Sequence, residues 1–144
     1  MSYKKPDDRT LHDILIQSKV IAVVGHSDKP DRTSYQIAKF LRSAGYQVYP
    51  VNPTIQEIDG QRSYASLAEV PEPIDIVNVF RRSEFLNEIV EDAIAAHAKT
   101  LWAQLGVLDQ AAALKAQQAG LNVIMNACIY TEHSRLVRRT PAQL

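Results

Sequence analysis

The sequence predicts an α/β fold, a Rossmann-type three-layer sandwich in which a mainly parallel sheet lies between two layers of helices. Short β-branched segments alternate along the chain with segments of helical periodicity, as is typical of parallel strands joined by crossover helices. The first strand segment, residues 20–24, is apolar without a break, as expected where helices cover both faces of the sheet. Right-handed crossovers then predict the strand order 3-2-1-4-5-6.

The first half of the chain predicts two helices and two central strands. Thr10 is a candidate cap for a short first helix whose apolar residues are Leu11, Ile14 and Leu15. After the first strand, apolar residues at helical spacing predict a second helix: Ile37, Phe40, Leu41 and Ala44. Gly45 follows, where a helix commonly ends in a left-handed conformation. Residues 48–51 then form the second strand, and residues 61–64 predict a short edge strand.

The second half continues the alternation. Residues 74–80 read as a strand, and Ser83 is a plausible N-cap for the helix that follows. Residues 101–105 predict the next strand, and Asp109 starts an alanine-rich helix that ends at Gly120. Residues 123–125 form the last strand, and residues 131–139 predict a final short helix.

Composition limits the possible functions. The chain has 144 residues, which fits one domain spanning 1–144, and its 16 Lys plus Arg balance 16 Asp plus Glu. A nucleic-acid or membrane-surface protein needs a basic excess, so the sequence predicts neither partner. The polar N-terminus lacks the apolar core of a secretory signal, and the lone Cys128 permits no internal disulfide. We therefore expect a cytoplasmic protein.

Ligands of doubly wound sheets bind at the carboxyl ends of the strands, so the candidate site residues are those that directly follow each predicted strand. After the first strand come Gly25, His26 and Ser27, and Arg32, Thr33 and Ser34 stand where the next helix begins. Backbone N–H groups at a helix start attract anions, which predicts a phosphate site. The alternative is that Gly25 only turns the chain and that Thr33 or Ser34 only caps the helix.

A nicotinamide cofactor is disfavoured by two departures from its usual pattern. The loop lacks the G-x-G-x-x-G fingerprint. The second strand ends in Asn52-Pro53, where an acidic residue normally binds the ribose hydroxyls.

The later strand ends add further candidates. Arg81 and Arg82 could pair with phosphate, although they could equally be solvated charges. Phe80 could lie against a flat ring or belong to the core. The remaining candidates at these ends are Gln104, Leu105, Gly106, Asn126 and Cys128. No nucleophile elbow, P-loop or paired-histidine metal motif is present, so these residues favour a binding module over an enzyme.

Several segments together resemble the small bacterial and archaeal CoA-binding proteins, which are similar to the CoA-binding domain of the succinyl-CoA synthetase α subunit. The resemblance rests on the sequence patterns at 24–35, 45–53, 75–81, 102–106 and 119–120, and on Cys128 with Glu132-His133. It covers about residues 10–136, and it implies a Rossmann-type domain that holds coenzyme A without catalysing a reaction itself.

The resemblance also implies a role for each candidate. Gly25, Ser27, Arg32 and Ser34 would line the diphosphate, and Asn52 and Pro53 would lie by the adenosine. Phe80, Arg81 and Arg82 would border the nucleotide, and residues 104–106 would follow the pantetheine. His26 stands where the family would have a small or apolar residue. One of Lys29, Arg32, Arg81 and Arg82 could pair with the 3′-phosphate.

Three functional hypotheses stay open from the sequence. The first is a CoA or acyl-CoA binding module that serves as a sensor or carrier. The second is an acyl-CoA-ligase-type enzyme component, or a thiol-transfer enzyme that uses Cys128. The third is a regulatory protein that binds NAD or an adenine nucleotide. A homodimer or an unknown protein partner is compatible with all three.

Overall fold

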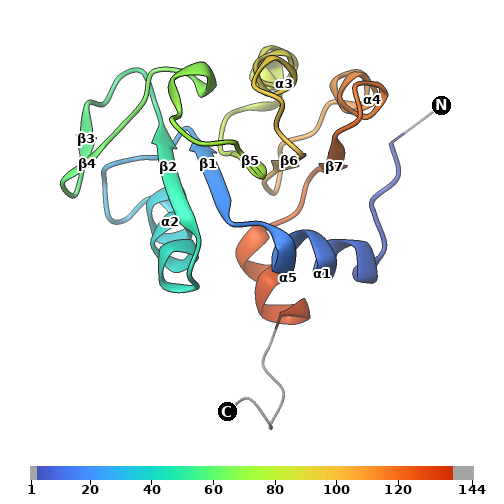
Figure 1. Ribbon diagram of the computed structural model, residues 1–144, viewed down its shortest axis with the longest axis horizontal. Helices are drawn as coiled ribbons and strands as arrows, with labels where there is room; N and C mark the ends of the chain where they lie inside the picture. The colour runs from blue at the N-terminus through green and yellow to red at the C-terminus, as the bar shows by residue number, and fades with distance from the viewer. Residues whose placement is uncertain (1–2, 138–144) are drawn as a thin grey trace, which may run out of the picture.

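The computed structural model describes residues 3–137 and has the three layers that the sequence predicts (Figure 1). Its central sheet contains five parallel strands in the order β2-β1-β5-β6-β7. These strands are β1 (Val20–Val24), β2 (Gln47–Val51), β5 (Ile76–Val79), β6 (Thr100–Ala103) and β7 (Asn122–Ile124). The α/β class is therefore confirmed, and every residue of β1 is buried, as the unbroken apolar pattern indicated.

Helices cover both faces of the sheet. One layer consists of α3 (Leu86–Ala95) and α4 (Gln110–Gln118), above the sheet in Figure 1. The other layer consists of α1 (Asp8–Gln17), α2 (Thr33–Ser43) and α5 (Ile129–Leu136). Two short 3-10 turns, η1 (Leu67–Glu69) and η2 (Ser83–Phe85), lie in the connections. Within residues 3–137, no helix is both long enough and apolar enough to cross a bilayer.

The strand order differs in detail from the prediction at the edge beyond β2. The segment expected to supply an edge strand forms a separate antiparallel hairpin, β3 (Glu57–Ile58) with β4 (Gln61–Arg62). At the outer edge of β2, Tyr64 is the one residue among 3–137 that pairs with the strand, donating its N–H to the Pro50 carbonyl and accepting from the Asn52 N–H. The imide nitrogen of Pro50 has no hydrogen to donate, so this edge of β2 cannot support a full ladder.

Two of the predicted helix caps are wrong. Asp7, not Thr10, caps α1: its carboxylate accepts a hydrogen bond from the Thr10 N–H at 2.9 Å. Ser83 opens η2, and its hydroxyl bridges the β6–α4 loop instead, accepting from the Leu108 N–H and donating to the Gly106 carbonyl. At α1 the Asp7 carboxylate reaches the Thr10 N–H, so Thr10 lies inside the helix. The Ser83 hydroxyl finds its partners in the β6–α4 loop and caps no helix.

Other predicted boundaries are confirmed or shift by a few residues. Asp109 caps α4 by accepting from the Ala112 N–H, and Gly45 ends α2 with a φ of 104°. The final helix, predicted for 131–139, begins earlier, at Ile129. Arg138 and Arg139 lie outside the described residues.

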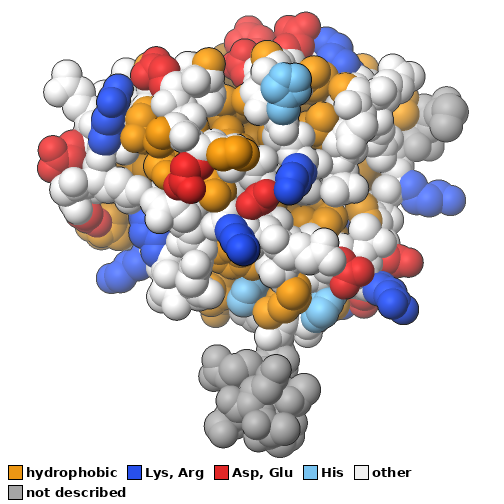
Figure 2. All heavy atoms as spheres, viewed as in Figure 1, with side chains coloured by type: hydrophobic (Ala, Val, Ile, Leu, Met, Phe, Trp, Pro, Cys, Tyr) orange, Lys and Arg blue, Asp and Glu red, His pale blue; other side chains and the backbone are white. Residues whose placement is uncertain are grey.

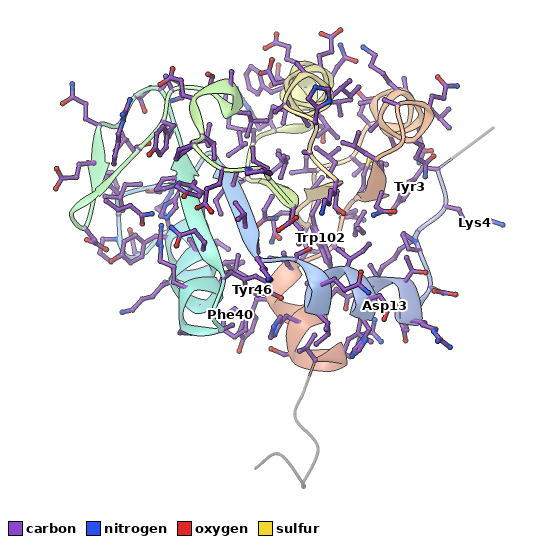
Figure 3. The ribbon with its side chains drawn as sticks, in the orientation of Figure 1. Tyr3, Lys4, Asp13, Phe40, Tyr46 and Trp102 are labelled. Atoms are coloured by element: carbon purple, nitrogen blue, oxygen red, sulfur yellow. The ribbon has the colours of Figure 1, made fainter. Side chains whose placement is uncertain are left out.

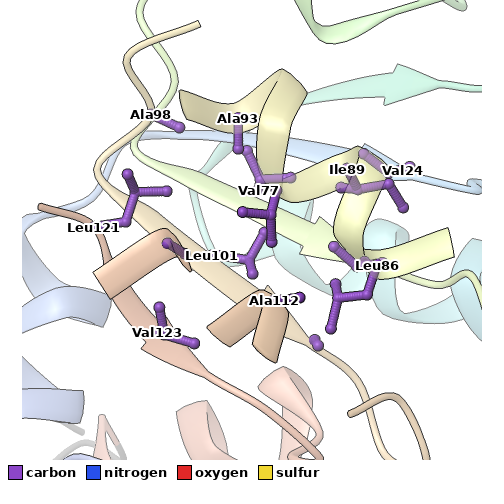
Figure 4. Close-up of a cluster of buried hydrophobic side chains, with 14 of the residues drawn as sticks. Val24, Val77, Leu86, Ile89, Ala93, Ala98, Leu101, Ala112, Leu121 and Val123 are labelled. Carbon is purple, nitrogen blue, oxygen red and sulfur yellow. The ribbon is translucent and has the colours of Figure 1, made fainter. Parts of the chain in front are cut away.

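Each face of the sheet has its own apolar core. Under α3 and α4, Leu86 packs with Val77 and Leu101, none of which is exposed to solvent (Figure 4). On the other face, the fully buried Trp102 of β6 donates its indole N–H to the Ala127 carbonyl at 3.0 Å (Figure 3). This bond ties the end of the sheet to the segment that leads into α5.

The start of the chain and α5 are held together by ion pairs. Glu132 is buried, and its carboxylate accepts hydrogen bonds from Lys5 at 2.8 Å and from Arg135 at 3.0 Å. Arg135 also pairs with Asp8 of α1. The Arg135 hydrogen bond, with help from Lys5, lowers the pKa of Glu132 despite its burial. These contacts fix α5 against the N-terminal segment and the start of α1.

We expect Trp102→Phe to lower the free energy of unfolding by about 1–3 kcal/mol, because the buried Ala127 carbonyl loses its donor. Urea unfolding measures this change. It is followed by circular dichroism, because Trp102 is the sole tryptophan and its replacement removes the tryptophan fluorescence signal. Leu108→Ala, at a side chain 45% exposed, is the control and should change stability far less. Equal effects of the two substitutions would contradict this account.

Candidate functional site

Two cavities open at the carboxyl end of the sheet. The β2-side cavity measures about 570 Å³ and is lined by residues 24–25, 51–54, 65–67 and 80–82, by Arg32 and by one face of α3. The β6-side cavity measures about 540 Å³ and is lined by Thr33, Cys128 and residues 80–82 and 104–107. Residues 80–82 line both, so the two cavities adjoin there and together extend across the strand ends; this pair of cavities is called the path below.

Residues 80–82 lie at the place where the strand order of the sheet reverses. From β1 the chain crosses outward to β2, and then returns past β1 to β5. The helices that follow β1 and β5 therefore lie on opposite faces of the sheet, which leaves a crevice beyond the strand ends. The sequence predicts the ligand site at this crevice.

Gly25 makes the crevice possible. Its φ is +86°, and a Cβ atom there would lie 2.7 Å from the Phe80 carbonyl oxygen. Its own N–H donates to the Val51 carbonyl at 2.9 Å, while the Phe80 N–H donates to the Val24 carbonyl. The end of β1 is thus held tightly against both neighbouring strands, which only glycine permits.

The loop after Gly25 is organised by its own polar groups. The Ser34 hydroxyl is buried and accepts the Ser27 N–H at 2.9 Å, and the Ser27 hydroxyl accepts the Lys29 N–H at 3.0 Å. The residue before α2 is Arg32, and its side chain makes no capping bond. Ser34 therefore stabilises the loop rather than capping the helix, which leaves the first N–H groups of α2 available at the crevice.

His26 is fully buried, with both ring nitrogens engaged. Nδ1 lies 2.8 Å from the Ser27 carbonyl and Nε2 lies 3.3 Å from the Arg42 guanidinium. A carbonyl requires a donor and a guanidinium an acceptor, so the ring is neutral with its proton on Nδ1. Burial, above all, lowers the pKa of His26 to about 4. The ring therefore lies inside the fold, where it hydrogen bonds to the loop backbone at Ser27.

Two asparagines fasten loops to one another. Asn52 donates from Nδ2 to the His26 carbonyl at 3.1 Å, while its Oδ1 accepts from Thr54. Asn126, at a φ of +54°, accepts the Gly106 N–H with its Oδ1 at 2.8 Å. These side chains hold the loop after β1 and the turn after β6 in place.

Arginines supply the positive charge at the centre of the path. The Arg81 guanidinium lies 4.2 Å from the centre of the Phe85 ring, and Arg82 lies 5.6 Å from it. Arg82 is largely exposed and pairs with Glu84 at 3.2 Å. Arg32 stands opposite, at the start of α2, and lines the β2-side cavity. These three cations can meet an anion in the crevice from two sides.

At the other end of the path, Cys128 lies directly before α5. Burial raises the pKa of its thiol, but hydrogen bonds from Thr131, Gln104 and Tyr130 outweigh burial and bring the pKa below its ordinary value. Gln104 is 6% exposed and lines the same cavity. A thiol with stabilised thiolate character therefore lies at the inner end of the path.

The structure brings most of the predicted site residues to the two cavities and puts the others behind them. Those that line a cavity are Gly25, Arg32, Asn52, Pro53, Phe80, Arg81, Arg82, Gln104, Leu105, Gly106 and Cys128. The others, His26, Ser27, Ser34 and Asn126, support the loops through the hydrogen bonds described above.

One wall of the β2-side cavity consists of residues that were not predicted from the sequence. Phe85, Glu88, Ile89 and Asp92 form this wall, together with residues 65–67. The first four recur at the spacing of one helical face, a signal that was present in the sequence. Figure 4 shows Ile89 beside Val24, where core and cavity floor meet. Residues 65–67 carry no motif, and only the chain path brings them here.

Residues 19–134 match the CoA binding domain family. The chain belongs to this family. The matched span contains every residue that lines the two cavities. It confirms the resemblance drawn from the sequence.

Known relatives are of two kinds. YneT of Bacillus subtilis (strain 168) is 45% identical over 91% of this chain and 97% of its own. A hypothetical protein from Pyrococcus horikoshii OT3 has a TM-score of 0.89 at 38% identity, covering 95% of this chain and 99% of the other. The α subunit of ADP-forming acetate–CoA ligase II from Pyrococcus furiosus is 31% identical over 53% of this chain, which is 17% of that subunit.

We expect Gly25→Ala to lower the free energy of unfolding by more than about 2 kcal/mol, through backbone strain and the clash with the Phe80 carbonyl. Gly60→Ala is a matched control, because Gly60 has a φ of +82° and nothing within 4 Å of the added atom. Strain alone should cost that variant about 1 kcal/mol. Urea unfolding that gives equal losses would remove the role of close approach.

The depressed pKa of His26 predicts an acid-sensitive fold. Between the ordinary value of 6.5 and about 4, the unfolded chain binds a proton that the folded chain does not. Stability should therefore fall as pH decreases through this window, by about 2 kcal/mol from this residue alone. His26→Gln should flatten the dependence of unfolding free energy on pH between 7 and 4.5. Parallel profiles for the variant and the original chain would contradict this assignment.

Proposed function

We propose that this protein binds coenzyme A along the path formed by the two cavities, as a binding module for CoA or an acyl-CoA. The observation that carries the proposal is the pair of adjoining cavities at the switch point, within a span that matches the CoA binding domain family. An elongated ligand with a nucleotide at one end and a thin arm at the other suits two cavities that share one wall.

The distribution of charge supports one orientation of the ligand. Arg81 and Arg82 lie at the junction, and Thr33 at the start of α2 lines the cavity beside them, so the diphosphate would lie there, while Arg32 lines the β2-side cavity alone. Glu88 and Asp92 line the distant part of the β2-side cavity, where a phosphate would be repelled. The uncharged adenine suits that part, with its amino group toward the carboxylates and its ring against Leu67 and Ile89.

The pantetheine arm would then extend into the β6-side cavity. Gly106 leaves this turn without a side chain, and its N–H is held by Asn126. The arm would run past Leu105 and Gly106 toward Cys128. The resident charges of the two cavities support this direction and disfavour the reverse, because the lining of the β6-side cavity beyond the shared arginines carries no charged side chain.

The relatives support a binding role for this part of the molecule. The match to the Pyrococcus furiosus ligase subunit spans 17% of that subunit, and related ADP-forming ligases match over similarly small shares. We propose that the chain holds CoA as a sensor or carrier and does not perform ligase chemistry.

Thermal unfolding with CoA, dephospho-CoA, acetyl-CoA, NAD and ATP tests this proposal. A ligand at 100 times its dissociation constant adds about 2.7 kcal/mol, which raises the Tm by several degrees. We expect CoA and acetyl-CoA to raise the Tm and NAD to leave it unchanged. A shift with NAD and none with CoA would overturn the proposal and favour a nucleotide-binding regulator.

Substitution of the arginines tests the orientation. Arg81→Ala should weaken CoA and dephospho-CoA to the same extent, by about 10-fold, because residues 80–82 lie at the junction where the diphosphate is placed. Arg32→Ala should weaken the binding of CoA more than that of dephospho-CoA, because Arg32 lines the β2-side cavity, where the nucleotide with its 3′-phosphate would lie. Lys39→Ala removes the same charge from an exposed position on α2 and serves as the control. Calorimetric titration showing a loss for CoA alone in Arg81→Ala would assign the 3′-phosphate to Arg81.

A further inference from the structure

Gln104 presents a hydrogen-bond donor to the β6-side cavity, beside the Cys128 sulfur. Its Oε1 accepts from the Asn78 side chain at 3.2 Å and from the Ile129 N–H at 2.9 Å. Two donors to the same atom fix that atom as the amide oxygen and determine how the side chain is oriented. Its Nε2 donates to no oxygen or nitrogen among residues 3–137, and it contributes to stabilising the Cys128 thiolate. Because Gln104 is only 6% exposed and its oxygen is held by two donors, this N–H group has a fixed position at the cavity wall.

Cys128 is the reactive group beside that donor. Its thiol is half-buried and free, and it lines the cavity together with Leu105 and Gly106. It precedes the first turn of α5, where Thr131 and Tyr130 offer their N–H groups to the sulfur. The ion pairs of Glu132 with Lys5 and Arg135 hold this turn in place. A sulfur with fixed donors around it and an open cavity in front of it is suited to react with a ligand in that cavity.

We propose that Cys128 forms a reversible mixed disulfide with the thiol end of coenzyme A held in the β6-side cavity. This inference rests on the proposed function, because the nucleotide must occupy the β2-side cavity for its sulfur to reach Cys128. The cavity then serves to store or sense CoA in its oxidised form, with Gln104 as a positioning residue for the two sulfur atoms.

The reaction is a thiol–disulfide exchange with a low-molecular-weight disulfide that contains CoA. The Cys128 thiolate attacks one sulfur of that disulfide, a new sulfur–sulfur bond forms and the original one breaks. The second CoA leaves as a thiolate and takes a proton from water. No other oxidant is required. A dithiol reductant removes the adduct by a second exchange, which releases Cys128 and CoA as thiols and leaves the reductant as its own disulfide.

The test compares two disulfides on the intact chain. Because Cys128 is the sole cysteine, mass spectrometry assigns any adduct without ambiguity. CoA disulfide should add one CoA unit at least about 10-fold faster than glutathione disulfide, which lacks the nucleotide. Dithiothreitol should remove the adduct, desulfo-CoA should slow its formation by competition, and Cys128→Ser should form none. The rate should also rise with pH through a midpoint below that of an ordinary cysteine.

A separate measurement distinguishes the failure of this inference from failure of the proposed function. Binding of desulfo-CoA, which has no thiol, reports the CoA site alone. If desulfo-CoA binds but CoA disulfide reacts no faster than glutathione disulfide, the mixed-disulfide proposal is wrong and the binding proposal stands. If desulfo-CoA does not bind, both proposals fail, even where Cys128 reacts with the two disulfides at equal rates.

Discussion

The close approach of β1 to β5 at Gly25 is the constraint on which the rest of the site depends. The backbone of Gly25 lies so near the Phe80 carbonyl that no side chain fits between them. This contact brings the loop before α2 next to residues 80–82, so cations from the end of β5 and from the start of α2 line one crevice. The sheet changes direction at the same place, which keeps the crevice open.

Polar side chains near the crevice divide into those that face it and those that hold it. Loops at strand ends carry backbone groups that need hydrogen-bond partners, and His26, Ser34, Asn52 and Asn126 supply them. A polar side chain that already hydrogen bonds to a loop backbone has fewer donors and acceptors left for a ligand. Arg81 instead lies over the Phe85 ring, and Arg82 pairs with the exposed Glu84, so neither guanidinium is committed to holding a loop. Across the face shown in Figure 2, by contrast, acidic and basic side chains are interspersed, in keeping with the zero net charge.

The two cavities differ in chemistry as well as position. The β2-side cavity combines arginines at its inner end with Glu88 and Asp92 further out, and so favours a ligand with charge at one end only. The β6-side cavity offers a turn without a side chain, a buried amide and a thiol. This contrast supports a nucleotide in the first and a thin, sulfur-bearing arm in the second, which is the basis of both proposals.

The sequence by itself determined the α/β class, most strand and helix positions, and the set of strand ends at which the site lies. It did so because apolar periodicity and glycine positions are local properties of the chain. The edge beyond β2, the wall at residues 65–67 and the inward direction of His26 were decided by tertiary structure alone. Each depends on which distant groups meet: Pro50 leaves the edge without a donor, and Arg42 offers His26 a partner inside the fold. Hydrogen-bond partners of this kind cannot be read from local sequence, since they exist only once the layers have packed.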